Sequence, residues 1–205
     1  MTMTLASDLA HQLRRAVKDE RVLAAIASTP RELFVPDSER PRAYENVALP
    51  IACDQTISQP LVVARMLELL RLRPNDRVLD VGTGSGYHAA LLGVLAGHVW
   101  TIERHPELSA QAEVAIAELG LTNVEFVVGD GWNGLTEQAP FDAINVAAAT
   151  GAAIPTALED QLADGGRLVA PVGRKEQYLV VTTRRNTQFE RVRMEPVRFV
   201  PLVRD

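Results

Sequence analysis

The segment Val78-Leu79-Asp80-Val81-Gly82-Thr83-Gly84-Ser85-Gly86 decides the fold. Its first half predicts a short buried strand, and its three glycines predict a tight turn that leads into a helix. Glycines adopt positive φ at little cost and let a ligand approach the backbone closely. Ligands of open parallel sheets bind at the carboxyl end of such strands. We therefore predict a binding site at this turn; the alternative is a tight turn that binds nothing.

Short apolar runs alternate with helical patterns on the carboxyl side of this segment. This alternation implies right-handed βαβ units and a mostly parallel sheet in an α/β fold. After Gly173 the helical pattern ends, so we expect antiparallel strands there. The predicted strands are 77–81, 98–103, 123–128, 142–147, 167–172, 178–185, 189–197 and 198–203, and the predicted helices are 88–96, 106–119 and 155–163.

The amino-terminal part of the chain is predicted to be helical. Leu9, Leu13 and Val17 recur at a spacing of four, with Ser7 as a candidate N-cap, and a second apolar stretch covers 22–27. The run Thr29-Pro30-Arg31-Glu32 predicts a capped short helical turn that ends near Phe34.

Residues 36–57 are expected to be irregular or extended. Ser58 is then a candidate N-cap for a helix that carries Val62, Met66, Leu69 and Leu70 on one side.

Composition limits the classes of function that the chain can serve. It has 205 residues, of which 47% are apolar and 23% charged, as in globular proteins, and its net charge is −5. This acidity argues against a nucleic-acid partner, which requires basic patches. With one cysteine, Cys53, the chain can form neither an internal disulfide nor a cysteine-based metal site, and we expect no metal.

The same residues predict where the protein resides. The first 15 residues do not read as a signal peptide, because charged residues and a histidine break the apolar stretch early. The longest near-apolar run, 89–99, is far shorter than the roughly 20 residues that a membrane span needs. We therefore expect a cytoplasmic protein with no membrane partner.

The glycine turn differs from both common phosphate-binding loops. Tyr87 stands where the dinucleotide fingerprint requires glycine or alanine, and the Gly-Lys-Ser/Thr ending of a Walker A loop is absent. Glu103 ends the next predicted strand, 17 residues after Gly86, where an acid can accept both hydroxyls of a ribose. The alternative for Glu103 is an ordinary carboxylate that faces solvent.

A third strand end carries Gly129-Asp130-Gly131. Asp130 is a candidate acceptor for an exocyclic amine such as that of adenine, and the alternative is a simple Asp-Gly turn. Together the three strand ends suit an adenosine moiety with a positively charged tail, as in S-adenosylmethionine.

On these residues the chain resembles the protein-L-isoaspartate O-methyltransferases, which belong to the class I S-adenosylmethionine-dependent methyltransferases. The glycine turn is shared by many methyltransferases, whereas Thr56-Ile57-Ser58 followed by Pro60 is more diagnostic. The matching segments are 43–46, 49–51, 55–60, 80–87, 128–131, 139–144, 165–169, 171–173 and 197–202.

The resemblance implies a single domain over 1–205. Within it, 1–76 is a helical amino-terminal and substrate-side segment, and 77–205 is a Rossmann-like core with helices on both faces of the sheet. It also implies a monomeric repair enzyme that methylates the free α-carboxylate of L-isoaspartyl residues in damaged proteins and peptides. The methyl donor is S-adenosyl-L-methionine, and the product is S-adenosyl-L-homocysteine.

The family's site residues map onto matching positions of this chain. The catalytic serine falls on Ser58, close to the donor methyl and the acceptor carboxylate. The alternative for Ser58 is a purely structural role as a helix N-cap, which contributes about 1 kcal/mol to stability. The implied cofactor contacts are Gln55, Thr56, Ile57, Ser58, Asp80, Gly82, Thr83, Gly84, Ser85, Gly86, Glu103, Arg104, Asp130 and Gly131.

Two segments depart from the family pattern. Ala52-Cys53-Asp54 replaces a glycine-containing stretch and brings a negative charge toward a site for a carboxylate, and 147–155 replaces a loop that is expected to shape the acceptor pocket. These departures keep open a methyltransferase for another carboxylate, on a small molecule or modified peptide. Two further alternatives are an NAD-dependent oxidoreductase and a non-enzymatic sensor of the cofactor.

Overall fold

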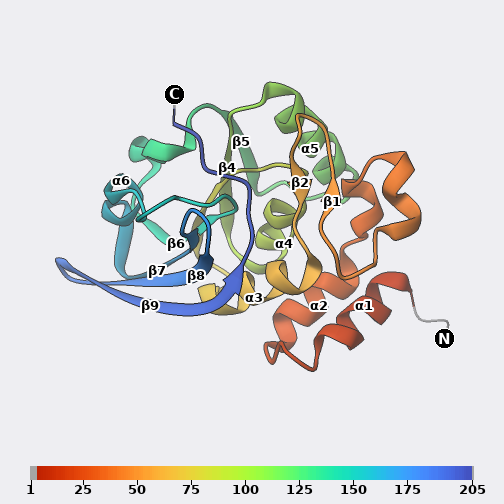
Figure 1. Ribbon diagram of the computed structural model, residues 1–205, viewed down its shortest axis with the longest axis horizontal. Helices are drawn as coiled ribbons and strands as arrows, with labels where there is room; N and C mark the ends of the chain where they lie inside the picture. Colours follow the sequence, from red (N-terminus) through yellow and green to blue (C-terminus); the bar gives the residue numbers. More distant parts are fainter. Residues whose placement is uncertain (1–3, 205) are drawn as a thin grey trace.

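One large twisted sheet organises the chain, with the strand order β5-β4-β3-β6-β7-β8-β9 (Figure 1). The computed structural model describes residues 4–204. Strands β3 to β7 are parallel to their neighbours within that group, and β8 and β9 are antiparallel. The strands of the large sheet are β3 (Arg77–Val81), β4 (His98–Glu103), β5 (Val124–Val128), β6 (Phe141–Val146), β7 (Leu162–Val172), β8 (Gln177–Arg185) and β9 (Gln188–Val197).

This order confirms the predicted fold class, a mostly parallel α/β sheet with an antiparallel carboxyl-terminal end. A separate two-stranded hairpin, β1 (Leu49–Pro50) with β2 (Thr56–Ile57), precedes the sheet. The helical elements are α1 (Leu5–Leu13), α2 (Glu20–Ser28), η1 (Arg31–Phe34), η2 (Asp37–Arg42), α3 (Pro60–Leu70), α4 (Tyr87–Leu95), α5 (Pro106–Glu118), η3 (Gly131–Asn133), η4 (Thr136–Gln138) and α6 (Thr156–Asp160).

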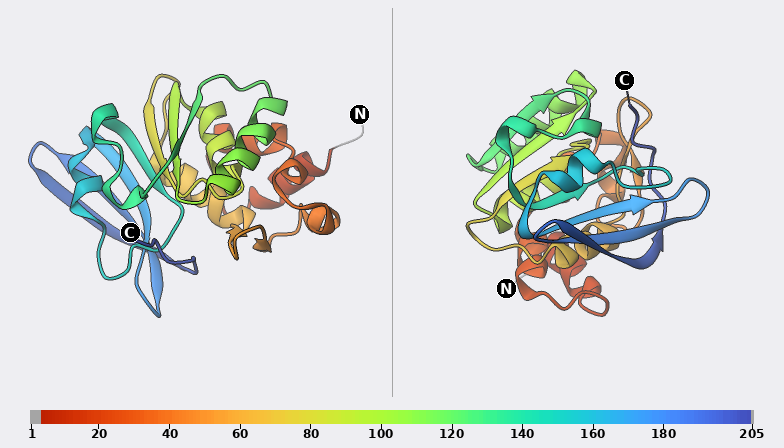
Figure 2. Two further views of the ribbon diagram at one scale, coloured as in Figure 1. Left: turned by 90° about the horizontal axis from the view of Figure 1, so that it is seen from above. Right: turned by 90° about the vertical axis from the view of Figure 1, so that its left-hand side faces the viewer.

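The two faces of the sheet are covered unequally (Figure 2). Buried side chains of α3, α4 and α5 share one core with alternate residues of the strands, and α1 and α2 pack outside them. The opposite face has its own core, which includes Leu158 of α6. Helices thus cover both faces as predicted, but the second face relies on the short α6 and on 3-10 turns.

The order of the strands places a crevice above β3. From β3 the chain builds β4 and then β5 on one side, and β6 then returns to the other side of β3. Where the strand order reverses, the loops that follow the two neighbouring strands run in opposite directions. Ligands bind in the crevice between these loops.

Three predicted helix caps are wrong. The side chain of Thr4, not Ser7, caps α1, because the helix starts at Leu5. The Thr29 hydroxyl donates to the Ala25 carbonyl at the end of α2, so it closes that helix instead of capping η1. Helix α3 begins at Pro60 without a side-chain cap, so the N-cap interpretation of Ser58 is also wrong.

In the last third of the chain, one predicted helix is shorter than expected and one predicted strand does not form. The helix predicted over 155–163 ends at Asp160, because Leu162 already pairs with Phe141 as the start of β7. Residues 198–203 form no strand of the sheet, and Pro201 makes one isolated bridge to Ala149. Proline lacks the N–H that a continuing ladder requires. This tail instead crosses toward the carboxyl ends of the parallel strands.

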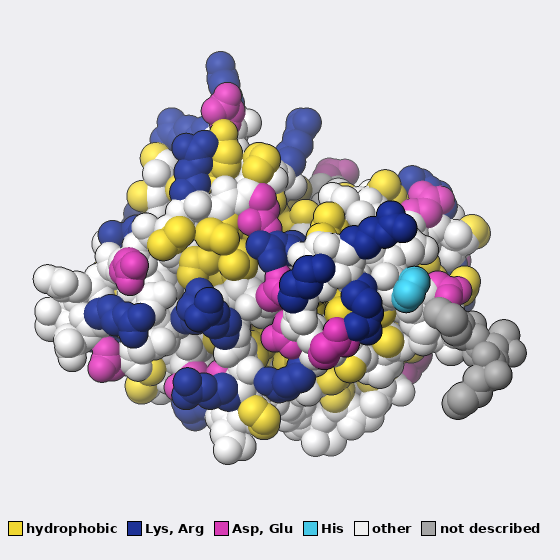
Figure 3. All heavy atoms as spheres, turned by 90° about the horizontal axis from the view of Figure 1, so that it is seen from below, with side chains coloured by type: hydrophobic (Ala, Val, Ile, Leu, Met, Phe, Trp, Pro, Cys, Tyr) yellow, Lys and Arg dark blue, Asp and Glu magenta, His cyan; other side chains and the backbone are white. Residues whose placement is uncertain are grey.

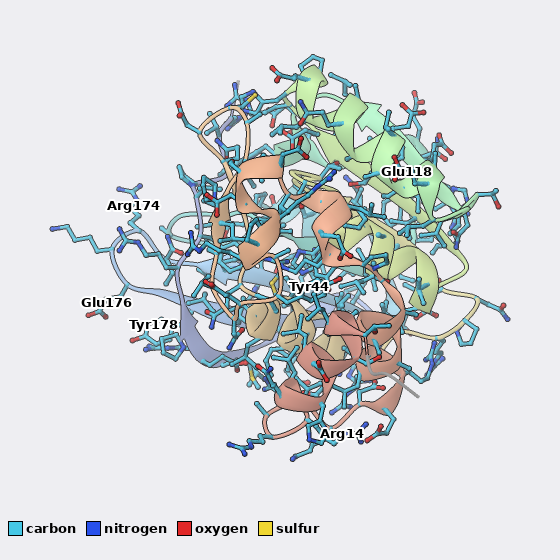
Figure 4. The ribbon with its side chains drawn as sticks, turned by 90° about the vertical axis from the view of Figure 1, so that its right-hand side faces the viewer. Arg14, Tyr44, Glu118, Arg174, Glu176 and Tyr178 are labelled. Atoms are coloured by element: carbon cyan, nitrogen blue, oxygen red, sulfur yellow. The ribbon has the colours of Figure 1, made fainter. Side chains whose placement is uncertain are left out.

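Two arginines of the β8–β9 ribbon have a structural role. Arg184 donates to the carbonyls of Asp160 and Leu162, and Arg191 forms an ion pair with the buried carboxylate of Glu159. At the β7–β8 turn, Arg174 and Glu176 project away from the body (Figure 4). On the face seen in Figure 3, basic and acidic side chains are interspersed. No helix within residues 4–204 is long and apolar enough to cross a membrane.

Candidate active site

A cleft opens at the carboxyl edge of the parallel strands. It lies at the reversal of strand order above β3, where the sheet topology places a ligand. Its walls come from the glycine turn, the end of β4, the β2 hairpin strand, α4 and the carboxyl-terminal tail. The lining includes Gln55, Thr56, Ile57, Ser58, Val63, Val81, Gly82, Thr83, Gly84, Ser85, Tyr87, His88, Ile102, Glu103, Arg104, His105, Gly131, Ala147, Ala148 and residues 200–203.

The structure brings eleven of the fourteen proposed cofactor residues to this lining. These are Gln55, Thr56, Ile57, Ser58, Gly82, Thr83, Gly84, Ser85, Glu103, Arg104 and Gly131. The other three, Asp80, Gly86 and Asp130, are not among the lining residues, but each has a recognisable role next to them.

Gly86 lets the start of α4 pack against α5. Its φ is +87°, and a Cβ added to it would lie 2.8 Å from the Cβ of Ala112. A larger residue would therefore strain the backbone and push the two helices apart. This glycine shapes the turn through packing.

Glu103 joins the end of β4 to the glycine turn. Its Oε2 accepts the backbone N–H of Gly84 at 2.9 Å, and its Oε1 accepts that of His105 at 3.0 Å. A carboxylate oxygen has two lone pairs, so each oxygen keeps capacity for a further donor. Because the carboxylate also lines the cleft, it is placed to accept two neighbouring hydroxyls of a ligand.

Asp80 is fully buried beneath the turn and links three strands. Its Oδ1 accepts from Asn145 Nδ2 at 2.7 Å, and its Oδ2 accepts from the Thr101 hydroxyl at 2.9 Å. That hydroxyl is 2.6 Å from the hydroxyl of Thr83, a turn residue that lines the cleft. Burial raises the pKa of the Asp80 carboxyl to about 7. Asp80 therefore supports the turn from below.

Asp130 and Gly131 close the cleft after β5. Asp130 Oδ1 accepts the backbone N–H of Trp132 at 2.8 Å and so caps η3. A Cβ on Gly131 would lie 2.6 Å from Cγ1 of Val81, so only glycine fits between this turn and β3. The close approach leaves the backbone of Gly131 at the surface of the cleft.

The β1–β2 hairpin forms the opposite wall. It pairs Leu49 with Ile57, and its turn holds Cys53 and Asp54, each with a φ of +56°. The Gln55 amide donates to the Cys53 carbonyl at 3.0 Å. Asp54 is exposed and lies outside the cleft lining, so its charge stands farther from the cleft than the sequence suggested.

Comparison with known proteins identifies the family. The family model described as Protein-L-isoaspartate(D-aspartate) O-methyltransferase matches residues 4–205. The chain belongs to this family. A protein-L-isoaspartate O-methyltransferase of Koribacter versatilis is 53% identical over 194 residues, which cover 94% of this chain and 87% of the relative. One of Cronobacter sakazakii is 52% identical over 197 residues, which cover 96% and 94%.

Solved structures of the same family share the fold. A protein-L-isoaspartate O-methyltransferase superposes with a TM-score of 0.84 at 28% identity; the match covers 95% of this chain, which spans 64% of the length of that one. A family member described as putative, from Plasmodium falciparum, gives a TM-score of 0.84 at 26% identity, with 98% of this chain and 99% of that chain covered. That protein was crystallised in complex with S-adenosyl-L-homocysteine.

Two parts of the cleft wall in this member of the isoaspartate methyltransferase family were not predicted from the sequence. Tyr87 and His88 line the cleft from α4, and the tail lines it through residues 200–203. The side chain of His88 is buried. The tail was part of the family resemblance, but its apolar alternation was interpreted as a strand.

The segment that departs from the family pattern, 147–155, is anchored on both sides. The backbone of Ala149 exchanges two hydrogen bonds with the tail, at Val200 and Leu202, each 2.8 Å long. The carbonyl of Gly151 accepts from Gly173 at 2.7 Å. Ala147 and Ala148 contribute small apolar side chains to the cleft, so this family member has an ordered wall there in spite of the altered sequence.

Proposed function

We propose that the protein transfers the methyl group of S-adenosyl-L-methionine to the free α-carboxylate of L-isoaspartyl residues in damaged proteins and peptides. Family membership over almost the whole chain supports the proposal. The observation that carries it is that one cleft is lined both by the glycine turn with Glu103 and by Ser58. A donor site and an acceptor site therefore share one space.

The residues present fit an adenosyl cofactor. The glycine turn and Gly131 present backbone without side chains, and Glu103 offers two oxygens for ribose hydroxyls. We propose that the residues that would hold the cofactor are those named from the sequence. Asp80 and Gly86 act from beneath the glycine turn, and Asp130 is the proposed acceptor for the exocyclic amine of adenine. Bound S-adenosyl-L-methionine supplies an electrophilic methyl group on a sulfonium.

The acceptor needs no general base. An α-carboxyl group has a pKa of about 3.5, so it is already ionised at neutral pH. Burial lowers the pKa of the nearby His88 imidazole to about 4, so this side chain is neutral at neutral pH. His88 therefore does not form an ion pair with the acceptor carboxylate. Alignment is then the main task, and orientation alone supplies on the order of 7–11 kcal/mol in favourable cases.

We assign the alignment of the acceptor to Ser58. It follows β2 and lines the cleft, and no capping bond to α3 engages its side chain. Its hydroxyl and the neighbouring backbone N–H groups are suited to hold a carboxylate, because an anion is stabilised by several N–H and O–H donors.

A methyltransferase for another carboxylate is the remaining competitor, motivated by the altered 52–54 and 147–155 segments. The oxidoreductase alternative has no support, because the chain belongs to a methyltransferase family. We further propose that the protein acts in the cytoplasm, which suits the unpaired thiol of Cys53, and that its partners are isoaspartyl proteins and peptides. A monomeric state stays a prediction.

The test uses matched peptides that differ in one linkage, aspartyl or isoaspartyl, together with a set of small carboxylic acids. Methyl ester formation is measured as base-released methanol from labelled S-adenosyl-L-methionine. We expect turnover on the isoaspartyl peptide and none above background on its aspartyl twin. Equal turnover on both peptides, or turnover only on the small acids, would refute the proposal, and cofactor binding without any transfer would favour the sensor.

A further inference from the structure

Arg31 is a fully buried cation whose bonded partners are main-chain carbonyls. Its Nε donates to the Ala43 carbonyl at 2.8 Å, and its Nη2 donates to the Ser58 carbonyl at 3.0 Å. Its guanidinium also lies over the ring of Tyr87, 4.9 Å from the centroid. Burial lowers the pKa of this guanidinium to about 10, so it stays charged at neutral pH although burial disfavours the charge.

The two carbonyls mark the ends of the segment that forms one wall of the cleft. Between Ala43 and Ser58 lies the β1–β2 hairpin, whose carboxyl-terminal strand and following residues line the cleft from Gln55 onward. One planar side chain therefore fastens both ends of this wall. Closing a flexible segment of this length has an entropic cost. The two Arg31 bonds, here called the clasp, restrict the conformational freedom of the segment before a ligand binds.

The floor beneath the clasp is polar as well as buried. Tyr87 and His88 line the cleft from α4, and both side chains are buried. Three buried polar atoms here have no hydrogen-bond partner, namely Arg31 Nη1, the Tyr87 hydroxyl and His88 Nε2. An unsatisfied buried polar group destabilises the folded state, so stability does not explain three of them at this place.

We propose that Arg31 is a positioning residue for methyl transfer, which acts by fixing the main chain of Ser58. This inference rests on the role proposed above for Ser58. The Arg31–Ser58 bond orients the peptide group that follows the Ser58 side chain, and through it the direction of the hydroxyl toward the cleft. Arg31 lies outside the cleft lining, so it acts through the main chain to which it is bonded.

A second arginine, which is exposed whereas Arg31 is buried, provides a control with the same bonding pattern. Arg21 also bridges two backbone carbonyls, with Nη1 bonded to Leu72 at 2.7 Å and Nη2 bonded to Leu95 at 2.9 Å. Neither carbonyl belongs to the cleft. Arg21→Lys therefore breaks the same kind of clasp at a place where only the stability of the fold depends on it.

The experiment compares Arg31→Lys with Arg21→Lys. In both variants the ammonium group of lysine lacks the planar set of donors with which the guanidinium bonds two carbonyls at once. The readouts are kcat and KM for an isoaspartyl peptide, the Kd for S-adenosyl-L-homocysteine by calorimetry, and Tm. We expect Arg31→Lys to lower kcat about 10-fold to 100-fold, as a small misplacement of the reacting groups does. Its Kd should rise by a smaller factor than kcat falls, since Glu103 and the glycine turn have their own anchors and the proposed cofactor contacts at 55–58 are only part of the site. Arg21→Lys should lower Tm and leave kcat unchanged.

A double-mutant cycle with Ser58→Ala separates positioning from folding. If Arg31 acts through Ser58, adding Arg31→Lys to Ser58→Ala should lower kcat by less than about twofold. Arg31→Gln, which buries no charge, replaces Arg31→Lys if the lysine variant fails to fold. Full additivity of the two losses, or a kcat of Arg31→Lys equal to that of Arg21→Lys, would overturn the inference. A wild-type protein without isoaspartyl activity would instead refute the proposed function.

Discussion

The backbone N–H of Gly84 donates to the Glu103 carboxylate across 2.9 Å, so the glycine turn after β3 and the end of β4 form one rigid unit. Backbone hydrogen bonds join the turn to β4 only at Gly82 and Thr83, whose N–H groups donate to the Ile102 carbonyl, and the Glu103 carboxylate extends this connection to Gly84. The carboxylate thereby has two roles, one in holding the turn and one in facing the cleft.

Replacing this carboxylate should weaken cofactor binding. In Glu103→Gln one oxygen becomes an NH₂ group, which cannot accept from Gly84 or from a ribose hydroxyl. We expect the Kd for S-adenosyl-L-homocysteine to rise about 10-fold to 100-fold, which corresponds to roughly 1.4–2.8 kcal/mol. Calorimetry measures it, and Glu125→Gln on the exposed side of β5 is the control. An unchanged Kd for Glu103→Gln would exclude the ribose role.

Removing the Ser58 hydroxyl should impair chemistry more than stability. Since this side chain does not cap α3, the free energy of unfolding of Ser58→Ala should stay within about 0.5 kcal/mol of the wild type. We expect kcat on an isoaspartyl peptide to fall about 10-fold to 100-fold through lost alignment. Ser28→Ala, which removes a hydroxyl bonded to the Ala25 carbonyl in α2, should leave kcat unchanged. If Ser58→Ala keeps full turnover, the hydroxyl has no part in alignment.

Asp80 should make stability depend on pH in the sense opposite to an ion-paired carboxylate. Burial raises its pKa in the folded protein from 3.8 to about 7. Between these values the folded state binds more protons than the unfolded state, so its contribution to stability is present below about pH 4 and is lost as the pH rises through 7.

The variant Asp80→Asn isolates this effect, because its side chain cannot ionise. We expect the difference in Tm, wild type minus Asp80→Asn, to fall steadily from pH 5 to pH 8. Thermal melts over that range in buffers of equal ionic strength measure it. A difference that is flat, or that rises with pH, would show that the carboxyl is ionised throughout.

The hairpin turn carries backbone strain that glycine would relieve. Cys53 has a φ of +56°, a region where a side chain costs about 1–2 kcal/mol relative to glycine. We expect Cys53→Gly to raise the free energy of unfolding by roughly 0.5–1 kcal/mol after the greater entropy of glycine in the unfolded chain is subtracted. Urea unfolding is the measurement. Ala52→Gly, at a position without positive φ, should destabilise, and the same sign at both positions would contradict the strain argument.

The central strands and the turn could be predicted because their determinants are local. The strands 77–81 and 98–103 were placed at their observed bounds, since each is a short buried run between clear breaks. Gly82, Gly84 and Gly86 all adopt positive φ, which is the property that the sequence pattern indicates. The cofactor-side residues follow from these strand ends, because parallel strands present their carboxyl ends at one edge.

The acceptor side could not be predicted in the same way, because distant segments build it. The bond from Arg31 to Ser58 spans 27 positions, and nothing local to either residue indicates it. The tail residues 198–203 alternate like a strand, yet Pro201 and the pairing with Ala149 draw them across the cleft. The wrong cap at Ser58 has a similar origin, since its carbonyl is held by Arg31, whereas the wrong caps at Ser7 and Thr29 are displaced by local contacts.

A crystal structure of the protein with S-adenosyl-L-homocysteine and an isoaspartyl peptide tests the central claim most directly. We predict that both ribose hydroxyls contact Glu103, and that the sulfur atom and the acceptor carboxylate meet beside the Ser58 hydroxyl. A nucleoside bound elsewhere, or a carboxylate that approaches the sulfur from a side remote from Ser58, would contradict the account.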